Sequence, residues 1–190
     1  MQSFKLIDKK QNPSLGFNAE RYELDEYGSE HIHLKNDSKE IVFMVMFRTI
    51  PESSSGVAHI LEHTTLCGSE NYKVRDPFFM MLRRSMSTFM NAFTASDWTA
   101  YPFATQNKKD FFNLLDVYLD AVYFPILAEE DFKQEGHRIE FSKYDKSNSP
   151  LEYKGVVFNE MKGSMSNIQS ITWQALTKSL FPDLTYRHNS

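Results

Sequence analysis

The stretch His59-Ile-Leu-Glu62-His63-Thr-Thr-Leu-Cys-Gly68-Ser69 decides how this sequence is interpreted. Residues four apart share one face of an α-helix, so the imidazoles of His59 and His63 can bind one metal ion. Glu62 lies about 60° round the helix from His59, taking roughly 100° per residue, and therefore flanks such an ion. Two histidines beside a carboxylate form the arrangement in which zinc activates water and a glutamate accepts its proton. The pattern indicates a metallohydrolase, and the alternative is a solvated helix face.

The sequence around this motif predicts alternating strands and helices. A helix is expected over 56–66, and Asp76 and Pro77 predict the start of another. Further helices are predicted over 108–124, 129–141, 155–164 and 169–180. Strands are predicted over 17–34 (one or two, with a break at 27–29), 41–47, 88–94 and 98–105. This order predicts an α+β fold with a mostly antiparallel sheet flanked by helices.

Bulk properties exclude several classes of protein. The chain has 190 residues, of which 41% are hydrophobic, so it suits one domain or a substantial part of a larger protein. A net charge of −4 gives no electrostatic footprint for nucleic acid. The longest apolar stretch, 41–47, is far too short to cross a membrane. Cys67 is the only cysteine, which rules out an intramolecular disulfide.

Neither end of the chain has the features of a targeting segment or of a domain boundary. The first residues lack the apolar core of a signal peptide, and they carry Asp8 without an early arginine, unlike a typical transit peptide. The sequence stops directly after helical and proline-containing sequence, at 186–190. We therefore expect a fragment of a longer protein.

A catalytic zinc ion usually has three protein ligands, so one is still needed. Glu160 stands out because it lies in the apolar helical stretch 156–161, where a carboxylate must be at a helix edge or paired. On chemistry alone, Glu135, Glu140 and Glu152 remain competitors. The segment from Glu135 to Glu140 either orients a ligating histidine or forms an exposed charged helix.

Cys67 is the remaining metal-binding side chain in the motif itself. We expect it to be a buried small residue, because the fourth zinc position must stay open for water. His31 and His33, on one side of a predicted strand, are expected to serve in packing rather than as ligands.

Several separated runs carry a resemblance to one family. They are 59–69, Asp76-Pro-Phe-Phe79, the run from Met90 to Pro102, and the run from Tyr153 to Gly163. Together they resemble the pitrilysin-type zinc metalloproteases, whose inverted His-x-x-Glu-His motif defines the inverzincins. The presequence protease branch is the most similar, from about Phe17 to the last residues.

The resemblance implies a pitrilysin or processing-peptidase-like domain and a set of site residues. Residues 1–190 correspond to its N-terminal catalytic zinc-binding domain, without the C-terminal part of the enzyme. His59, His63 and Glu160 correspond to the ligands of one Zn²⁺ ion, and Glu62 to the general base.

The wider family often has a second acidic residue seven positions before its third ligand. That position is occupied by Tyr153 here, with Glu152 beside it, so no such carboxylate is assigned.

The resemblance also implies a substrate-binding strand and a function. Asn91-Ala92-Phe93-Thr94 corresponds to the edge strand to which an extended peptide adds through main-chain hydrogen bonds; an ordinary hairpin strand is the alternative. The implied activity is zinc-dependent degradation of short unstructured peptides, such as cleaved targeting presequences.

The implied partners are the peptide substrate and the C-terminal half of the same enzyme, with neither nucleic acid nor membrane. The compartment would be the cytoplasm for a bacterial protein, and the mitochondrial matrix or a plastid for a processed eukaryotic one. Two rivals remain: an inactive or truncated family member that acts as a peptide-binding or structural module, and a peptidase that processes precursors.

Overall fold

The computed structural model describes residues 4–24 and 27–188 of the chain. These residues form two compact units, one within Met1–Glu40 and the other within Ile41–Ser190. Within the described ranges, no helix combines the length and the apolar character needed to cross a lipid bilayer.

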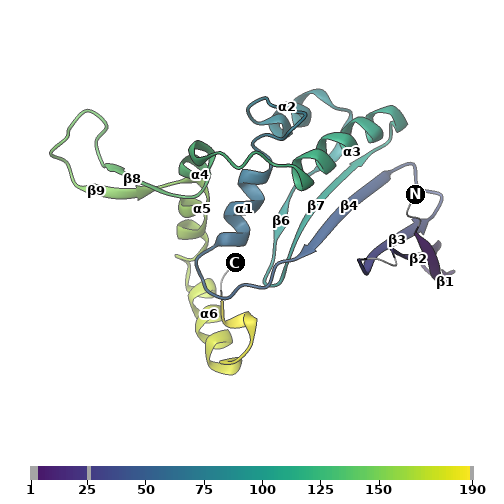
Figure 1. Ribbon diagram of the computed structural model, residues 1–190. Coiled ribbons are helices and arrows are strands. Elements are labelled where there is room, and N and C mark those ends of the chain that lie inside the picture. Colours follow the sequence, from purple (N-terminus) through teal and green to yellow (C-terminus); the bar gives the residue numbers. More distant parts are fainter. Residues whose placement is uncertain (1–3, 25–26, 189–190) are drawn as a thin grey trace. The chain divides into compact units, whose positions relative to one another are not determined.

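The first unit is a three-stranded antiparallel sheet in the order β1-β2-β3 (Figure 1). Its strands are β1 (Lys5–Asn12), β2 (Phe17–Leu24) and β3 (Ser29–Lys35). The predicted break at 27–29 is confirmed as the connection between β2 and β3, although Asp25 and Glu26 lie outside the described residues. Strand β1 was not predicted, because its mostly polar residues show no clear alternation and nearly all of them are exposed.

A buried carboxylate, Glu20 on β2, ties the three strands of this sheet together. The Lys9 Nζ atom on β1 donates a hydrogen bond to it at 2.8 Å, and so does the Tyr22 hydroxyl, also at 2.8 Å. Lys35 on β3 adds an ion pair at 3.7 Å. The hydrogen bonds from Lys9 and Tyr22 lower the pKa of Glu20 to about 2, because they favour its charged form.

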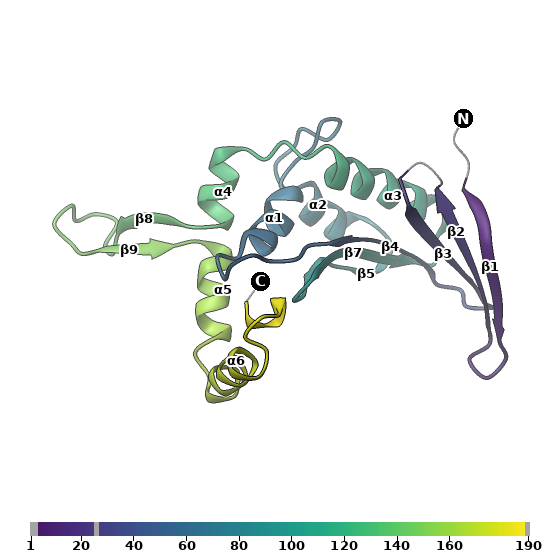
Figure 2. The same cartoon turned by 60° about the horizontal axis from the view of Figure 1, so that its bottom comes forward.

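The second unit is built on a sheet whose central strand is β7 (Trp98–Thr105). Strand β4 (Ile41–Arg48) pairs with it antiparallel along its whole length. On the other side β7 pairs with β5 (Ser87–Met90; Figure 2) and then with β6 (Phe93–Thr94; Figure 1), and these two short strands form one edge of the sheet. The strand predicted over 88–94 is therefore interrupted at Asn91 and Ala92.

Alternation along β4 decides which face of this sheet is covered. Phe43, Val45 and Phe47 pack on the core, whereas the residues that alternate with them, Val42, Met44 and Met46, are exposed. The covering element on the core side is α3 (Lys108–Tyr123), which runs along β4 and β7 (Figure 1). Its buried side chains Leu114 and Tyr118 meet Phe103 of β7, whose ring centroid is 5.0 Å from that of Tyr118.

The other helices of the second unit agree with the predicted α+β arrangement of antiparallel sheet and flanking helices. These helices are α1 (Val57–Thr65), α2 (Pro77–Arg84), α4 (Glu129–Glu135), α5 (Val156–Ser164) and α6 (Ile168–Leu180), followed by a short 3-10 turn (Thr185–Arg187). Asp76 directly precedes α2, as predicted, but its side chain forms no cap hydrogen bond.

The helix predicted over 129–141 is wrong after Glu135. Gly136 ends α4, and the chain then forms β8 (Arg138–Phe141), which pairs antiparallel with the unpredicted strand β9 (Leu151–Lys154). The period changes here from helical to alternating, with Ile139 and Phe141 on one side of the hairpin. Glu140, on the other side, makes ion pairs with Arg138 and Lys154 at 2.8 and 2.9 Å.

The Glu20 cluster makes the stability of the first sheet depend on pH. The folded-state pKa of about 2 lies below the ordinary value near 4.3, so the stabilisation is full above that ordinary value. It is lost as the pH falls through about 2. We expect the protection of β2 amides against hydrogen exchange to fall over this pH window in the wild-type protein. In Glu20→Gln the protection should be lower throughout and should depend less on pH. The control is Glu23→Gln, on the opposite face of the same strand; equal pH profiles for all three proteins would contradict the assignment.

Candidate metal centre

Helix α1, which carries the His59–His63 pair, lies between the β6 edge of the sheet and the helices α4 and α5 (Figure 1). Its start is set by Gly56, whose φ of 73° is in the left-handed region that favours glycine. The Gly56 carbonyl accepts the Ile60 N–H at 2.9 Å and begins the helix. The predicted helix over 56–66 is thus confirmed, and both histidines lie on it.

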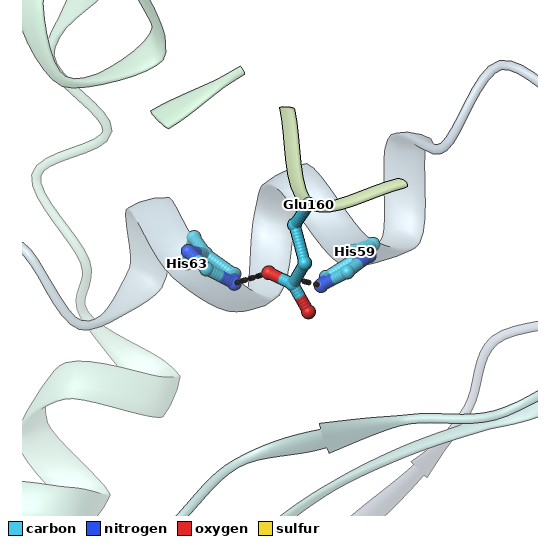
Figure 3. Close-up of side chains that lie close together, drawn as sticks. All are labelled: His59, His63 and Glu160. Carbon is cyan, nitrogen blue, oxygen red and sulfur yellow. Dashed lines mark ion pairs between the residues drawn. The ribbon is translucent and has the colours of Figure 1, made fainter. Parts of the chain in front are cut away.

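The structure brings together His59, His63 and Glu160 (Figure 3). The Glu160 Oε2 atom lies 3.8 Å from the Nε2 atom of His59 and 3.8 Å from the Nε2 atom of His63. Ligand atoms bound about 2.0–2.2 Å from a tetrahedral zinc ion would lie roughly 3.4 Å apart, so this spacing is close to that of a zinc site. Two imidazoles and a carboxylate are also a donor set that zinc accepts.

Glu160 reaches the histidines from α5, a helix far from α1 in sequence. Val157 of α5 is buried at 3% exposure and anchors that helix. The Glu160 side chain is 55% exposed and lies at the helix edge, which agrees with one of the two environments expected for a carboxylate in this apolar stretch.

The competing carboxylates lie elsewhere. Glu140 is paired with Arg138 and Lys154 on the β8–β9 hairpin, and Glu152 is 3.2 Å from Lys154 on the same hairpin. Neither belongs to the group of metal-binding side chains found among the described residues.

Glu135 has a different position from the other competitors. Its Oε2 atom lies 3.1 Å from the Nδ1 atom of His63, on the side of the ring away from Glu160. The segment 135–140 was expected either to orient a histidine or to form an exposed charged helix. The contact between Glu135 and His63 fits the first of these interpretations. Tyr153 supplies no acidic group; its ring packs between those of His137 and Phe158.

Glu62 is buried at 6% exposure and has a specific donor. The Thr94 hydroxyl donates a hydrogen bond to the Glu62 Oε2 atom at 2.5 Å. Thr94 Oγ1 is also 3.3 Å from Thr99 Oγ1, which is 2.8 Å from Thr49 Oγ1. The role of these hydroxyl groups was not predicted, because the three threonines become neighbours only when the sheet forms.

Cys67 is buried, as expected, and its Sγ atom donates to the His63 carbonyl oxygen at 3.5 Å. Burial raises the pKa of its thiol to about 12, and the charges of Asp131 and Glu135 contribute in the same direction. Cys67 does not belong to the group of metal-binding side chains that converge among the described residues, which agrees with the expected buried small residue.

The predicted substrate-binding residues lie on the sheet edge beside α1. Asn91 and Ala92 link β5 to β6, and the Asn91 N–H donates to the Pro102 carbonyl oxygen at 3.1 Å. Phe93 and Thr94 pair with β7, and no other strand in the described part of the chain pairs with their outer side. The Phe93 ring stacks on Phe89 at 6.3 Å, while Thr94 is directed to Glu62.

A pocket of about 260 Å³ lies between this edge and α1. Its polar side is formed by Glu62, His63 and Glu135, so it opens beside the candidate metal centre. Its other lining residues are mostly apolar: Leu66, Cys67, Asp76, Phe78, Phe79, Leu82, Met90, Asn91 and Ala92.

Comparisons with known proteins support the relationship suggested by the sequence. The sequence model of the family described as "Insulinase (Peptidase family M16)" matches residues 48–171. "Presequence protease, mitochondrial" of Xenopus tropicalis is 55% identical over 174 residues, which cover 92% of this chain and 17% of that protein. The protein of the same name from Schizosaccharomyces pombe is 48% identical over 190 residues, covering 100% of this chain and 19% of that protein.

A solved structure of pitrilysin has a similar fold, with a TM-score of 0.56 at 18% sequence identity. The match covers 68% of this chain and 14% of that chain. The chain thus spans less than a fifth of the length of the curated relatives described above.

The Thr94–Glu62 hydrogen bond allows a direct test of how the buried carboxyl is held. Replacing Thr94 by Val removes the donor at similar size, and we expect this change to lower the free energy of unfolding by about 1–3 kcal/mol. Thr94→Ser keeps a hydroxyl and is the matched control. Urea unfolding followed by tryptophan fluorescence measures both. Losses for Val and Ser that agree within about 0.5 kcal/mol would show that the hydrogen bond does not hold Glu62.

Proposed function

Because this chain belongs to the insulinase family of peptidases (peptidase family M16), we propose that it forms the zinc-binding part of a zinc metalloendopeptidase. Its substrates would be short unstructured peptides, such as cleaved presequences. The observation that carries the proposal is the convergence of His59 and His63 from α1 with Glu160 from α5.

In this proposal His59 and His63 bind one Zn²⁺ ion through their Nε2 atoms, and Glu160 binds it through its carboxylate. Zinc, when bound, supplies a Lewis acid that polarises a peptide carbonyl and makes water acidic enough to lose a proton near neutral pH. The spacing of 3.8 Å from Glu160 to each imidazole supports this ligand set. The surroundings of Glu140 and Glu152 disfavour them as substitutes.

Glu62 is proposed to act as the general base. It follows His59 by three positions on α1, so it lies beside the metal-binding face of the helix. The Thr94 hydroxyl holds the Oε2 atom of its carboxylate, and the Oε1 atom is then available to accept a proton from the attacking water. Glu62 would return that proton to the nitrogen of the leaving amine.

The edge formed by Asn91, Ala92, Phe93 and Thr94 is proposed to bind the peptide. An extended peptide can add to this edge through main-chain hydrogen bonds, which depend on an extended conformation more than on sequence. A folded protein offers few such free segments, so the mode favours unstructured peptides. The pocket beside Glu62 would receive an apolar substrate side chain, because Phe78, Phe79 and Leu82 line it.

The relatives are about five times longer than this chain, since it covers 17% of one of them. We propose that a C-terminal half of the same enzyme closes over this part and completes the site. The names of the relatives also support a mitochondrial location, which is one of the compartments expected from the sequence.

The ligand set is tested by comparing Glu160→Gln with Glu152→Gln, a competitor carboxylate on β9. We expect one zinc ion per wild-type chain. Glu160→Gln should lower the zinc affinity by more than roughly 100-fold, which is the upper range for residues that only orient the ligands. Glu152→Gln should leave the zinc affinity unchanged. Titration against a zinc indicator measures the affinities. A wild-type chain without zinc after reconstitution would contradict the metal site and favour a peptide-binding module.

The same preparations test the general base. Glu62→Gln is expected to keep zinc while the hydrolysis of a fluorogenic peptide falls by about 10²–10⁴-fold. Zinc binding without turnover in the wild-type chain would mean that the C-terminal half is required for catalysis. Faster cleavage of an intact precursor than of its free presequence would instead favour a processing peptidase.

A further inference from the structure

We propose that Glu135 is a positioning residue for His63, and that a backbone contact between Gly136 and Gly155 joins Glu135 to the helix that carries Glu160. This inference rests on the proposed function in so far as His63 is a zinc ligand. Glu135, Gly136 and Gly155 would orient the proposed ligands before a metal ion binds.

The contact between Glu135 and His63 determines which nitrogen of the ring carries the proton. The His63 Nδ1 atom lies 3.1 Å from Glu135 Oε2, and its Nε2 atom lies 3.8 Å from Glu160 Oε2. A carboxylate at Nδ1 favours the tautomer in which Nδ1–H donates, which leaves the Nε2 lone pair directed to the side of Glu160. The ring is therefore prepared for metal binding.

Glu135 is itself held in place. Its side chain is only 12% exposed, and its second oxygen, Oε1, accepts a hydrogen bond from the Gln134 Nε2 atom at 2.9 Å. Both carboxylate oxygens thus have a donor. A surface carboxylate with free rotamers could not fix the orientation of an imidazole in this way.

Two glycines explain why Glu135 and Glu160 lie on the same side of α1. A Cβ atom on Gly155 would be 2.0 Å from the Gly136 carbonyl oxygen and 2.9 Å from the His137 Cα atom. A Cβ atom on Gly136 would be 2.9 Å from the Phe132 carbonyl oxygen and 3.1 Å from Ile60 Cγ2 on α1. The end of α4, the start of α5 and the side of α1 therefore meet at a point where side chains have no room.

The β8–β9 hairpin begins and ends at this point. The hairpin starts after Gly136 and ends before Gly155, and Arg138 pairs with Lys154 near its base (Figure 1). The backbone positions that flank the hairpin, Gly136 and Gly155, are therefore in contact with each other. Glu135 directly precedes that contact and α5 directly follows it, so the orienting carboxylate and the proposed ligand Glu160 are placed by one packing interaction.

The effect of Glu135 on the tautomer is measured without metal, by ¹⁵N NMR of the histidine rings at about pH 8, where a free imidazole is neutral. We expect His63 in the wild-type protein to be mainly protonated at Nδ1 and to lose this preference in Glu135→Leu. Glu135→Gln, whose amide oxygen can still accept the proton, should restore much of it. Glu130→Gln, an exposed position on the same helix, is the control and should match the wild type.

Zinc affinity of the same variants gives a second readout. We expect Glu135→Leu to weaken binding by about 10- to 100-fold, the range for carboxylates that orient ligating histidines, and Glu130→Gln to leave it unchanged. The inference would be overturned if Glu135→Leu kept both the wild-type tautomer distribution of His63 and a zinc affinity within about twofold of wild type. The proposed function would still stand in that case. A wild-type chain that binds no zinc would refute the proposed function, and the NMR result would then decide the role of Glu135 alone.

Gly155→Ala tests the backbone contact without removing any metal-binding atom. Gly163→Ala is its control, because Gly163 lies in α5, the helix that begins directly after Gly155, and a Cβ atom there has nothing within 4 Å. We expect Gly155→Ala to lower the zinc affinity or the melting temperature relative to Gly163→Ala. Equal affinities and equal melting temperatures in the two variants would overturn this part of the inference.

Discussion

The packing of α1 against elements on both of its sides is the constraint on which the candidate site depends. On one side, Thr94 of the sheet edge holds the carboxyl of Glu62. On the other, Glu135 at the end of α4 holds the ring of His63. The helix alone would present these side chains with free rotamers, and the sheet and α4 fix two of them. Only then can Glu160, from a third element, complete a group of three donors within 4.8 Å of one another.

The balance of charge in this region is consistent with a bound cation. Glu62 and Glu135 line one pocket, and Glu160 lies beside the two histidines that adjoin it. Carboxylates gathered where water is partly excluded repel one another, and a divalent cation offsets that repulsion. Each of the two less exposed carboxyls also has a donor of its own, Thr94 for Glu62 and His63 for Glu135. Both carboxyls are thus held by protein groups, and in the proposed ligand set neither of them binds the metal.

Local periodicity made much of this arrangement predictable. The helical spacing of His59 and His63, the apolar run 41–47 and the helical spacing of apolar residues over 108–124 are each encoded within a few residues, and the structure has the predicted helix or strand at each place. The run 41–47 was expected to be a buried strand, but one face of β4 is exposed, because an unbroken apolar run does not show which face is covered. The hairpin was missed because Arg138, Glu140 and their neighbours suit an exposed helix as well as a strand. What selects the strand is pairing with Leu151–Lys154, which is not visible within either segment.

The same distinction applies to the site. Glu160 was selected through the resemblance, since spacing alone did not separate it from Glu135, Glu140 and Glu152. The contacts of Thr94 and Glu135 depend on which elements become neighbours in the folded chain. The glycines at 136 and 155 were not singled out either, because the absence of room for a side chain is a property of the packed structure.

X-ray absorption at the zinc K-edge of the reconstituted chain shows whether His59, His63 and Glu160 bind one zinc ion together. We expect one zinc ion surrounded by nitrogen and oxygen ligands at about 2.0–2.2 Å, with two imidazoles and no sulfur. Glu160→Gln should alter that spectrum, whereas Glu152→Gln should not. A sulfur ligand at about 2.3 Å, or a spectrum with no imidazole contribution, would contradict the site formed by His59, His63 and Glu160.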